Sequence, residues 1–149
     1  MRTFPALVMA AGALLLAATS ASARPVRSTV VGTWLIEEPA APFPLHMYVF
    51  NADGTMQQAN PDAGDPQTSD SDGKGVWAMR GDHVIGKWVE ILADRTTRKL
   101  AGRGELSFDL LVTGNRLTGT ARFVQFDAAG QQVQAYPPDQ LTGSRVTLP

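Results

Sequence analysis

Apolar and polar residues alternate through nearly every segment between Val30 and Leu148, and stretches rich in glycine, proline or other turn formers separate these segments. A repeat of two is the spacing of a β-strand with one buried face, and it does not suit an amphipathic helix. We therefore predict nine short antiparallel strands. Their ranges are Val30–Glu37, Leu45–Asn51, Thr55–Ala59, Gly75–Arg80, His83–Ala93, Arg103–Thr113, Leu117–Asp127, Gln131–Tyr136 and Leu141–Leu148.

A run of strands joined by hairpins commonly closes into a barrel, because closure removes exposed strand edges. Two distant features favour closure here: Gly32-Thr33-Trp34 in the first strand and Arg145 in the last. A Trp side chain plugs one end of a small barrel, and a guanidinium stacked on its face shields it from water. We predict an all-β, eight- to nine-stranded antiparallel up-and-down barrel that is sealed at the Trp34 end. An interior of this size is either filled by side chains or able to hold one small ligand.

The first residues have the composition of a secretory signal peptide. Arg2 supplies a positive charge, Ala6–Ala18 is a short apolar run, and Ala21-Ser22-Ala23 resembles a cleavage site. The alternative is an uncleaved membrane anchor, but the apolar run is shorter than the ~20 residues that span a bilayer. We expect residues 1–23 to be a signal peptide, residues 24–29 a flexible leader and residues 30–149 one barrel domain. The expected location is the periplasm or the extracellular space.

Composition excludes several classes of function. The chain has no cysteine, so thiol catalysis, Cys-ligated zinc and iron–sulfur clusters are excluded. Lys and Arg number 13 and Asp and Glu 14, for a formal net charge of −1. Because no basic stripe is visible, nucleic acid is not an expected partner. We expect a monomer without cofactor or metal, and with no membrane span after signal cleavage.

Several short motifs resemble the lipocalin-like, or calycin, superfamily. Gly32-Thr33-Trp34 together with Arg145 is one, and the segment Ser69–Trp77, which reads SDSDGKGVW, looks like a motif of small exported bacterial lipocalin-like proteins. Asp53-Gly54-Thr55 and Leu117–Ala121 fit the same pattern. The large helix that most lipocalins place against the barrel has no counterpart. The resemblance implies a lipocalin-like barrel, and it does not identify a ligand, because similar barrels include binding proteins and some enzymes.

Aromatic residues in the predicted strands are the first candidates for a binding site. Apolar pockets with a few polar groups are the usual sites for small molecules. Each aromatic residue also suits ordinary core packing, so the two interpretations stay open. The candidates that we select to line a cavity are Tyr48, Trp77, Trp88 and Phe123.

Two polar residues, His46 and Glu90, are the candidates for orienting a ligand. His46 shares a strand face with Tyr48, and Glu90 lies among apolar residues in Lys87–Leu92. An inward Glu90 would have a raised pKa and suit acid–base chemistry or anchoring. The sequence favours the other orientation, an outward carboxylate beside Lys87, because the two faces of this strand are not cleanly separated.

The acidic stretch Asp62–Asp72 has two interpretations. Its carboxylates could supply oxygen ligands to calcium, but an EF-hand register would put Met79 where that loop has a bidentate Glu. The favoured alternative is a solvated turn in which Asp and Ser side chains accept hydrogen bonds from nearby backbone N–H groups. We also expect Ser69–Gly75 to form a fixed lip at the barrel mouth.

The sequence favours an exported barrel that binds a small apolar or amphipathic molecule. One alternative is an enzyme of the same fold, a cyclase, isomerase or hydratase, with His46, Tyr48 and Glu90 as its acid–base set. A second alternative is a structural envelope protein with a filled barrel. No catalytic motif is present: there is no G-x-S-x-G elbow and no H-E-x-x-H helix.

Overall fold

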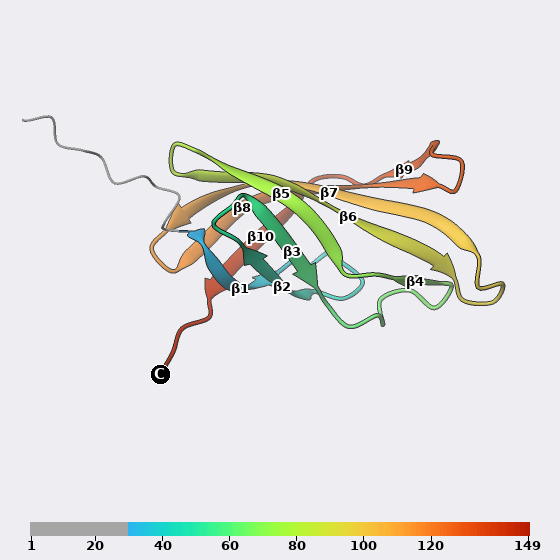
Figure 1. The fold of residues 1–149 in the computed structure, drawn as a ribbon, viewed down its shortest axis with the longest axis horizontal. Helices are drawn as coiled ribbons and strands as arrows, with labels where there is room; N and C mark the ends of the chain where they lie inside the picture. Colours follow the sequence, from blue (N-terminus) through green and yellow to red (C-terminus); the bar gives the residue numbers. More distant parts are fainter. Residues whose placement is uncertain (1–29) are drawn as a thin grey trace, which may run out of the picture.

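The computed structural model describes residues 30–149 and contains ten β-strands (Figure 1). The predicted signal peptide and leader lie outside the described residues. The strands are β1 Gly32–Glu37, β2 Leu45–Phe50, β3 Thr55–Ala59, β4 Thr68–Asp70, β5 Gly73–Arg80, β6 His83–Asp94, β7 Leu100–Thr113, β8 Arg116–Asp127, β9 Gln132–Ala135 and β10 Asp139–Arg145. Each of the nine predicted strands is present, and β4 is the additional one.

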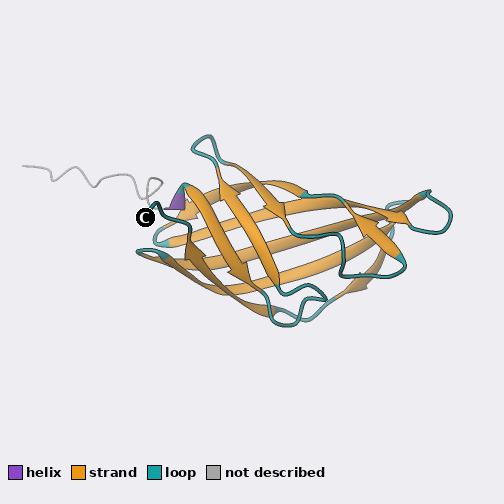
Figure 2. Cartoon of the chain, turned by 90° about the horizontal axis from the view of Figure 1, so that it is seen from below, coloured by secondary structure: helices purple, strands orange, loops and turns teal. Residues whose placement is uncertain are grey.

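Eight of these strands form a closed antiparallel barrel (Figure 2). Neighbouring strands follow one another in the order β1-β2-β3-β5-β6-β7-β8-β10, and β10 pairs with both β8 and β1 to close the circle. The predicted fold class is therefore confirmed. The short strands β4 and β9 lie outside the circle, paired with β6 and β8 respectively.

The long strands β6, β7 and β8 continue past the open end of the barrel. Strand β4 flanks the far part of β6, where Asp70 is opposite Leu92, and β9 flanks the far part of β8, where Ala135 is opposite Val124. The result is a sheet that projects beyond the mouth (Figure 1). One wall of the mouth is therefore strand and the rest is made of loops.

Trp34 and Arg145 seal the opposite end of the barrel, as the sequence predicts. The Trp34 side chain is fully buried, and its Nε1 donates a hydrogen bond to the carbonyl oxygen of Val30 at 2.8 Å. The Arg145 Cζ atom lies 4.3 Å from the centre of the Trp34 ring. Its Nη1 donates to the carbonyl oxygen of Val31 at 2.7 Å, which fixes the guanidinium over the indole.

The packed core fills the barrel between this seal and its middle. Tyr48, Phe50, Trp77 and Phe108 meet there, with ring centres 5.7 to 6.2 Å apart. Their geometries are edge-on or tilted, which suits the quadrupoles of aromatic rings. The alternation predicted for the strand that becomes β7 is confirmed, because Leu106, Phe108 and Leu110 are all buried.

Candidate functional site

A cavity of about 390 Å³ opens at the end of the barrel opposite Trp34. Three loops surround its mouth: residues 38–44 between β1 and β2, residues 60–67 between β3 and β4, and residues 136–138 between β9 and β10. Its inner wall comes from β2, β3, β6, β7 and β8. The barrel is thus packed at one end and hollow at the other, and the volume is within the range of ~300–1000 Å³ typical of small-molecule sites.

The cavity wall on β6 follows from the period of two. Trp88, Glu90 and Leu92 are buried on the inner face, while Lys87 and Ile91 point to solvent. Strand β8 contributes Phe123 beside them. The Trp88 and Phe123 rings have centres 6.2 Å apart at 50° and form an aromatic side to the cavity.

Glu90 points inward, so the outward orientation favoured by the sequence is wrong. Glu90 is only 7% exposed, and its carboxyl group makes no hydrogen bond or ion pair within residues 30–149. Burial raises its pKa to about 8, and the nearby carboxyl groups of Asp70 and Glu38 add to the effect. The favoured interpretation fails because Val89 and Ile91 make the outer face of β6 nearly as apolar as the inner one.

A glycine leaves the space that Glu90 occupies. Gly104 on β7 is the direct cross-strand partner of Glu90. A Cβ atom at position 104 would lie 2.7 Å from Glu90 Oε1 and would collide with the ring of Phe123. The absence of a side chain at Gly104 therefore lets the carboxyl group and the aromatic ring share this part of the wall.

Glu38 is a second buried carboxyl group, and it is not among the site residues predicted from the sequence. It follows β1 directly and is 7% exposed, because its N–H donates to the carbonyl oxygen of Pro44 at 2.9 Å and folds the loop over it. Burial raises its pKa to about 7, with a further contribution from Asp139. Its signal was available, since Glu38 is in phase with Trp34 and Ile36 on the inner face of the first strand.

Hydrogen bonds fix the protonation state of His46. Gly73 N–H donates to Gln58 Oε1 at 2.9 Å, so Gln58 Nε2 faces Nδ1 of His46, 3.1 Å away. The amide nitrogen is a donor, so His46 Nδ1 accepts and the ring proton is on Nε2. That Nε2 is buried, lies 3.9 Å from Glu38 Oε2 and has no hydrogen-bond partner among residues 30–149.

The pKa of His46 agrees with a neutral ring. Burial lowers it, and a contact with the backbone of Phe43 opposes this only in part. His46 therefore presents a neutral N–H group toward the cavity, beside the carboxyl group of Glu38.

Four of the six residues selected from the sequence line this cavity: His46, Trp88, Glu90 and Phe123. Tyr48 lies behind the wall, fully buried, and its hydroxyl accepts a hydrogen bond from Trp88 Nε1 at 3.0 Å. Burial raises the pKa of Tyr48, so the phenol stays protonated. Trp77 is near the sealed end, where its Nε1 donates to the carbonyl oxygens of Asn51 and Thr55.

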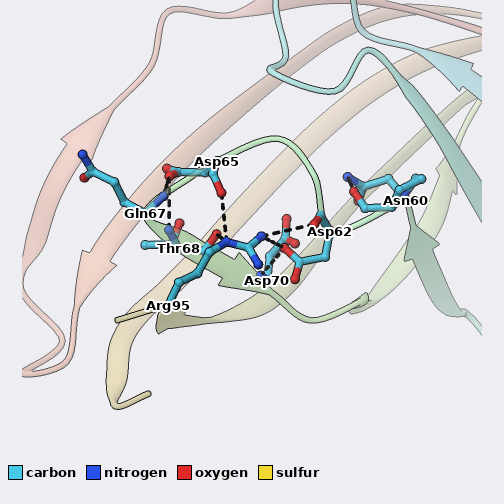
Figure 3. A network of polar contacts seen from close by, with 8 residues as sticks. Asn60, Asp62, Asp65, Gln67, Thr68, Asp70 and Arg95 are labelled. Carbon is cyan, nitrogen blue, oxygen red and sulfur yellow. Dashed lines mark hydrogen bonds and ion pairs between the residues drawn. The ribbon is translucent and has the colours of Figure 1, made fainter. Parts of the chain in front are cut away.

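The acidic stretch forms a turn whose carboxylates bond nearby backbone groups, which confirms the favoured interpretation (Figure 3). One oxygen of Asp65 accepts from the N–H groups of Gln67 at 2.6 Å and Thr68 at 3.1 Å. The sequence did not predict the role of Arg95. Its guanidinium pairs with Asp62 and donates to three carbonyl oxygens of the loop, those of Asp62, Asp65 and Thr68 (Figure 3).

Two features that residues 30–149 lack bear on alternative sites. No group of three or more His, Asp or Glu side chains in this part of the chain is arranged to hold a metal ion. No helix within it is long and apolar enough to cross a membrane. Comparisons of the sequence and the structure with protein-family models, curated proteins and solved structures find no match.

Proposed function

We propose that this chain is an exported, lipocalin-like protein that binds one small amphipathic molecule in the cavity at the open end of the barrel. The observation that carries the proposal is the composition of the cavity wall. Trp88 and Phe123 give the cavity an aromatic surface, and Glu38, His46 and Glu90 give the same cavity a cluster of polar groups. A ligand with an apolar body and a polar head would satisfy both.

The polar cluster supports an amphipathic ligand rather than a purely apolar one. A polar group that is buried without a partner costs free energy, and within residues 30–149 His46 Nε2 is such a group. The carboxyl group of Glu90, on a residue that is 7% exposed, also lines the cavity. A ligand head that hydrogen-bonds them would recover that cost. The apolar body would add roughly 25 cal/mol for each Å² that it buries.

The closed eight-stranded barrel is compatible with a lipocalin-like assignment, and the sealed end with Trp34 under Arg145 supports it. Export rests on the composition of residues 1–23. The mature chain would begin at Arg24 and act as a monomer. Intact-mass analysis of the protein recovered from the periplasm or the medium would test both cleavage and export.

A second candidate function is catalysis in the same cavity. Two of the three residues expected for an enzyme, His46 and Glu90, line one cavity, and Glu38 adds a third titratable group. With pKa values of about 7 and about 8, Glu38 and Glu90 can each donate or accept a proton near neutral pH. An isomerase or cyclase needs only such proton transfers and a shaped apolar cavity. Conversion of a co-purified molecule by fresh protein would distinguish an enzyme from a carrier.

The neutral dye Nile red, which fluoresces in apolar surroundings, tests the binding function directly. We expect a saturable rise in fluorescence with one dye per chain. Ala121→Phe and Gln125→Trp should each weaken it, because both side chains would enter the cavity. Val76→Phe is the matched control, since Val76 is 63% exposed on the outer surface.

Circular dichroism melts would show that each variant is folded. A wild-type protein that gives no saturable signal would refute the binding proposal. So would equal affinity in the wild type and both cavity-filling variants, because the dye would then bind elsewhere.

A further inference from the structure

The formally charged side chains that line the cavity are all acidic within residues 30–149. No Lys or Arg is among the lining residues in the part of the chain that the structure describes. The carboxyl groups come from five different elements of the fold, so no single loop accounts for them. They are Glu38, Asp65, Asp70, Glu90 and Asp139.

Elsewhere the chain pairs carboxylates with cations, whether they are partly buried or exposed. Glu105 on the outer face of β7 is paired with Lys87 and Arg103, and these partners lower its pKa. Asp62 is paired with Arg95. Glu90 is more deeply buried than either, and no Lys or Arg of residues 30–149 pairs with it, although Arg103 belongs to the strand next to its own.

His46 does not supply the positive charge that Glu90 lacks. Its Nδ1 accepts a hydrogen bond from Gln58, whose orientation is set by Gly73. Protonation of Nδ1 would bring two donors face to face, so the ring stays neutral while this network is intact. Within residues 30–149, the carboxyl groups of Glu38 and Glu90 are therefore left with no positive partner.

The aromatic residues of the cavity also favour a positively charged ligand. Trp88, Phe123 and Tyr136 follow one another around the mouth, with ring centres 6.2 and 5.8 Å apart. The faces of aromatic rings attract cations, and tryptophan does so most strongly. An aromatic wall and buried carboxyl groups in one cavity are the chemistry that recognises an ammonium group on an apolar body.

We propose that the ligand of this cavity is a small organic cation, a protonated amine carried on an apolar or aromatic body. Its ammonium group lies between Glu38 and Glu90, and its body packs against Trp88 and Phe123. This inference rests on the proposed binding function and names its ligand class.

Ionisation of the carboxyl groups accompanies binding. Glu90 faces Asp70 from β4 and Glu38 from the end of β1, while Glu38 also faces Asp139 from β10 and His46 from β2. Four of these five groups are acidic, and the neutral His46 offers no competing charge. An ammonium ion therefore displaces protons from the cavity, and its affinity rises as the pH increases through neutrality.

Three probes of nearly equal size and shape test the inference: phenethylamine, phenethyl alcohol and phenylacetate. Isothermal titration calorimetry at about pH 8 should rank the amine first, the alcohol at least about ten-fold weaker and the anion below detection. Titrations of the amine in two buffers of different ionisation enthalpy should reveal proton release.

Two cavity variants test whether the carboxyl groups of Glu38 and Glu90 bind the ammonium group. Glu90→Gln and Glu38→Gln should each weaken phenethylamine by about ten-fold or more and leave phenethyl alcohol nearly unchanged. The matched control is Glu37→Gln, because Glu37 is the exposed neighbour of Glu38 and points away from the cavity. This control should bind all three probes as the wild type does.

Each outcome is decisive. Equal or tighter binding of the alcohol, an unchanged amine affinity in both cavity variants, or binding of none of the probes would overturn the cation inference. Nile red separates this failure from that of the binding function. A protein that binds Nile red in the cavity but is indifferent to the amine still binds small molecules, and only the ligand class would be wrong.

Discussion

Removing the carboxyl group of Glu90 should make the protein more stable, by an amount that grows as the pH rises from about 5 to about 8. The folded protein holds this group 7% exposed with a pKa of about 8, against an ordinary value of 4.5. At 1.36 kcal/mol for each pKa unit, this difference corresponds to roughly 5 kcal/mol. That is a large part of the ~5–15 kcal/mol by which domains are usually stable.

The sign follows from the direction of the change. The folded-state pKa lies above the unfolded-state value, so the folded protein binds the proton more tightly. Below about pH 4.5 Glu90 is protonated in both states and does not lower the free energy of unfolding. As the pH rises from there through about 8, the free energy of unfolding falls because of this group. Glu38 acts in the same direction, with its effect extending through about pH 7.

Urea unfolding followed by circular dichroism at about pH 5, 7 and 9 measures this effect. We expect the wild type to lose several kcal/mol across the range and Glu90→Gln to lose much less. The two proteins should be similar near pH 5 and differ by roughly 5 kcal/mol near pH 9. Glu37→Gln, an exposed control, should follow the wild type. A Glu90→Gln curve parallel to that of the wild type at every pH would refute the reasoning.

Three further predictions concern the frame around the site. Trp34→Ala should lower the free energy of unfolding by about 3–5 kcal/mol and leave Nile red affinity in the folded fraction unchanged, as urea unfolding and dye titration would show. Gln58→Leu should cost about 1–3 kcal/mol in urea unfolding, and should move His46 shifts in an NMR pH titration, because Gly73 N–H loses its acceptor and His46 its donor. Arg95→Ala should speed hydrogen exchange in residues 62–70 while changing global stability by less than about 1 kcal/mol.

The barrel could be predicted from the sequence because its signals are local and repeated. Alternation of apolar and polar residues predicts nine strands, and all nine are present. The hairpin turn that Asp53-Gly54 predicts is also present, with Gly54 at a φ of +88°. The closure was readable because Trp34 and Arg145 are unusual residues at the right ends of the chain. Strand β4 was missed because Thr68–Asp70 is polar and only three residues long, so it depends on pairing with β6.

The acidic character of the cavity was harder to predict, since it depends on which way single residues face. Glu90 was assigned to the wrong face because apolar residues occupy both faces of its strand. Glu38 is in phase with the inner face of the first strand, but it comes directly before Pro39, and its burial also depends on how residues 39–44 fold over it. The neutral state of His46 depends on Gln58 and Gly73, which are 12 and 27 positions away in the sequence and meet only in the barrel.

The three tryptophan indole N–H groups offer the most direct test of where a ligand binds. Trp34 is at the sealed end, Trp77 is hydrogen-bonded to carbonyl groups near that end, and Trp88 lines the cavity. In a ¹H–¹⁵N NMR titration with phenethylamine, we predict a saturable shift of the Trp88 indole signal and almost none for Trp34 and Trp77. A shift confined to Trp34 or Trp77, or no saturable shift of Trp88, would contradict the claim that the open-end cavity is the binding site.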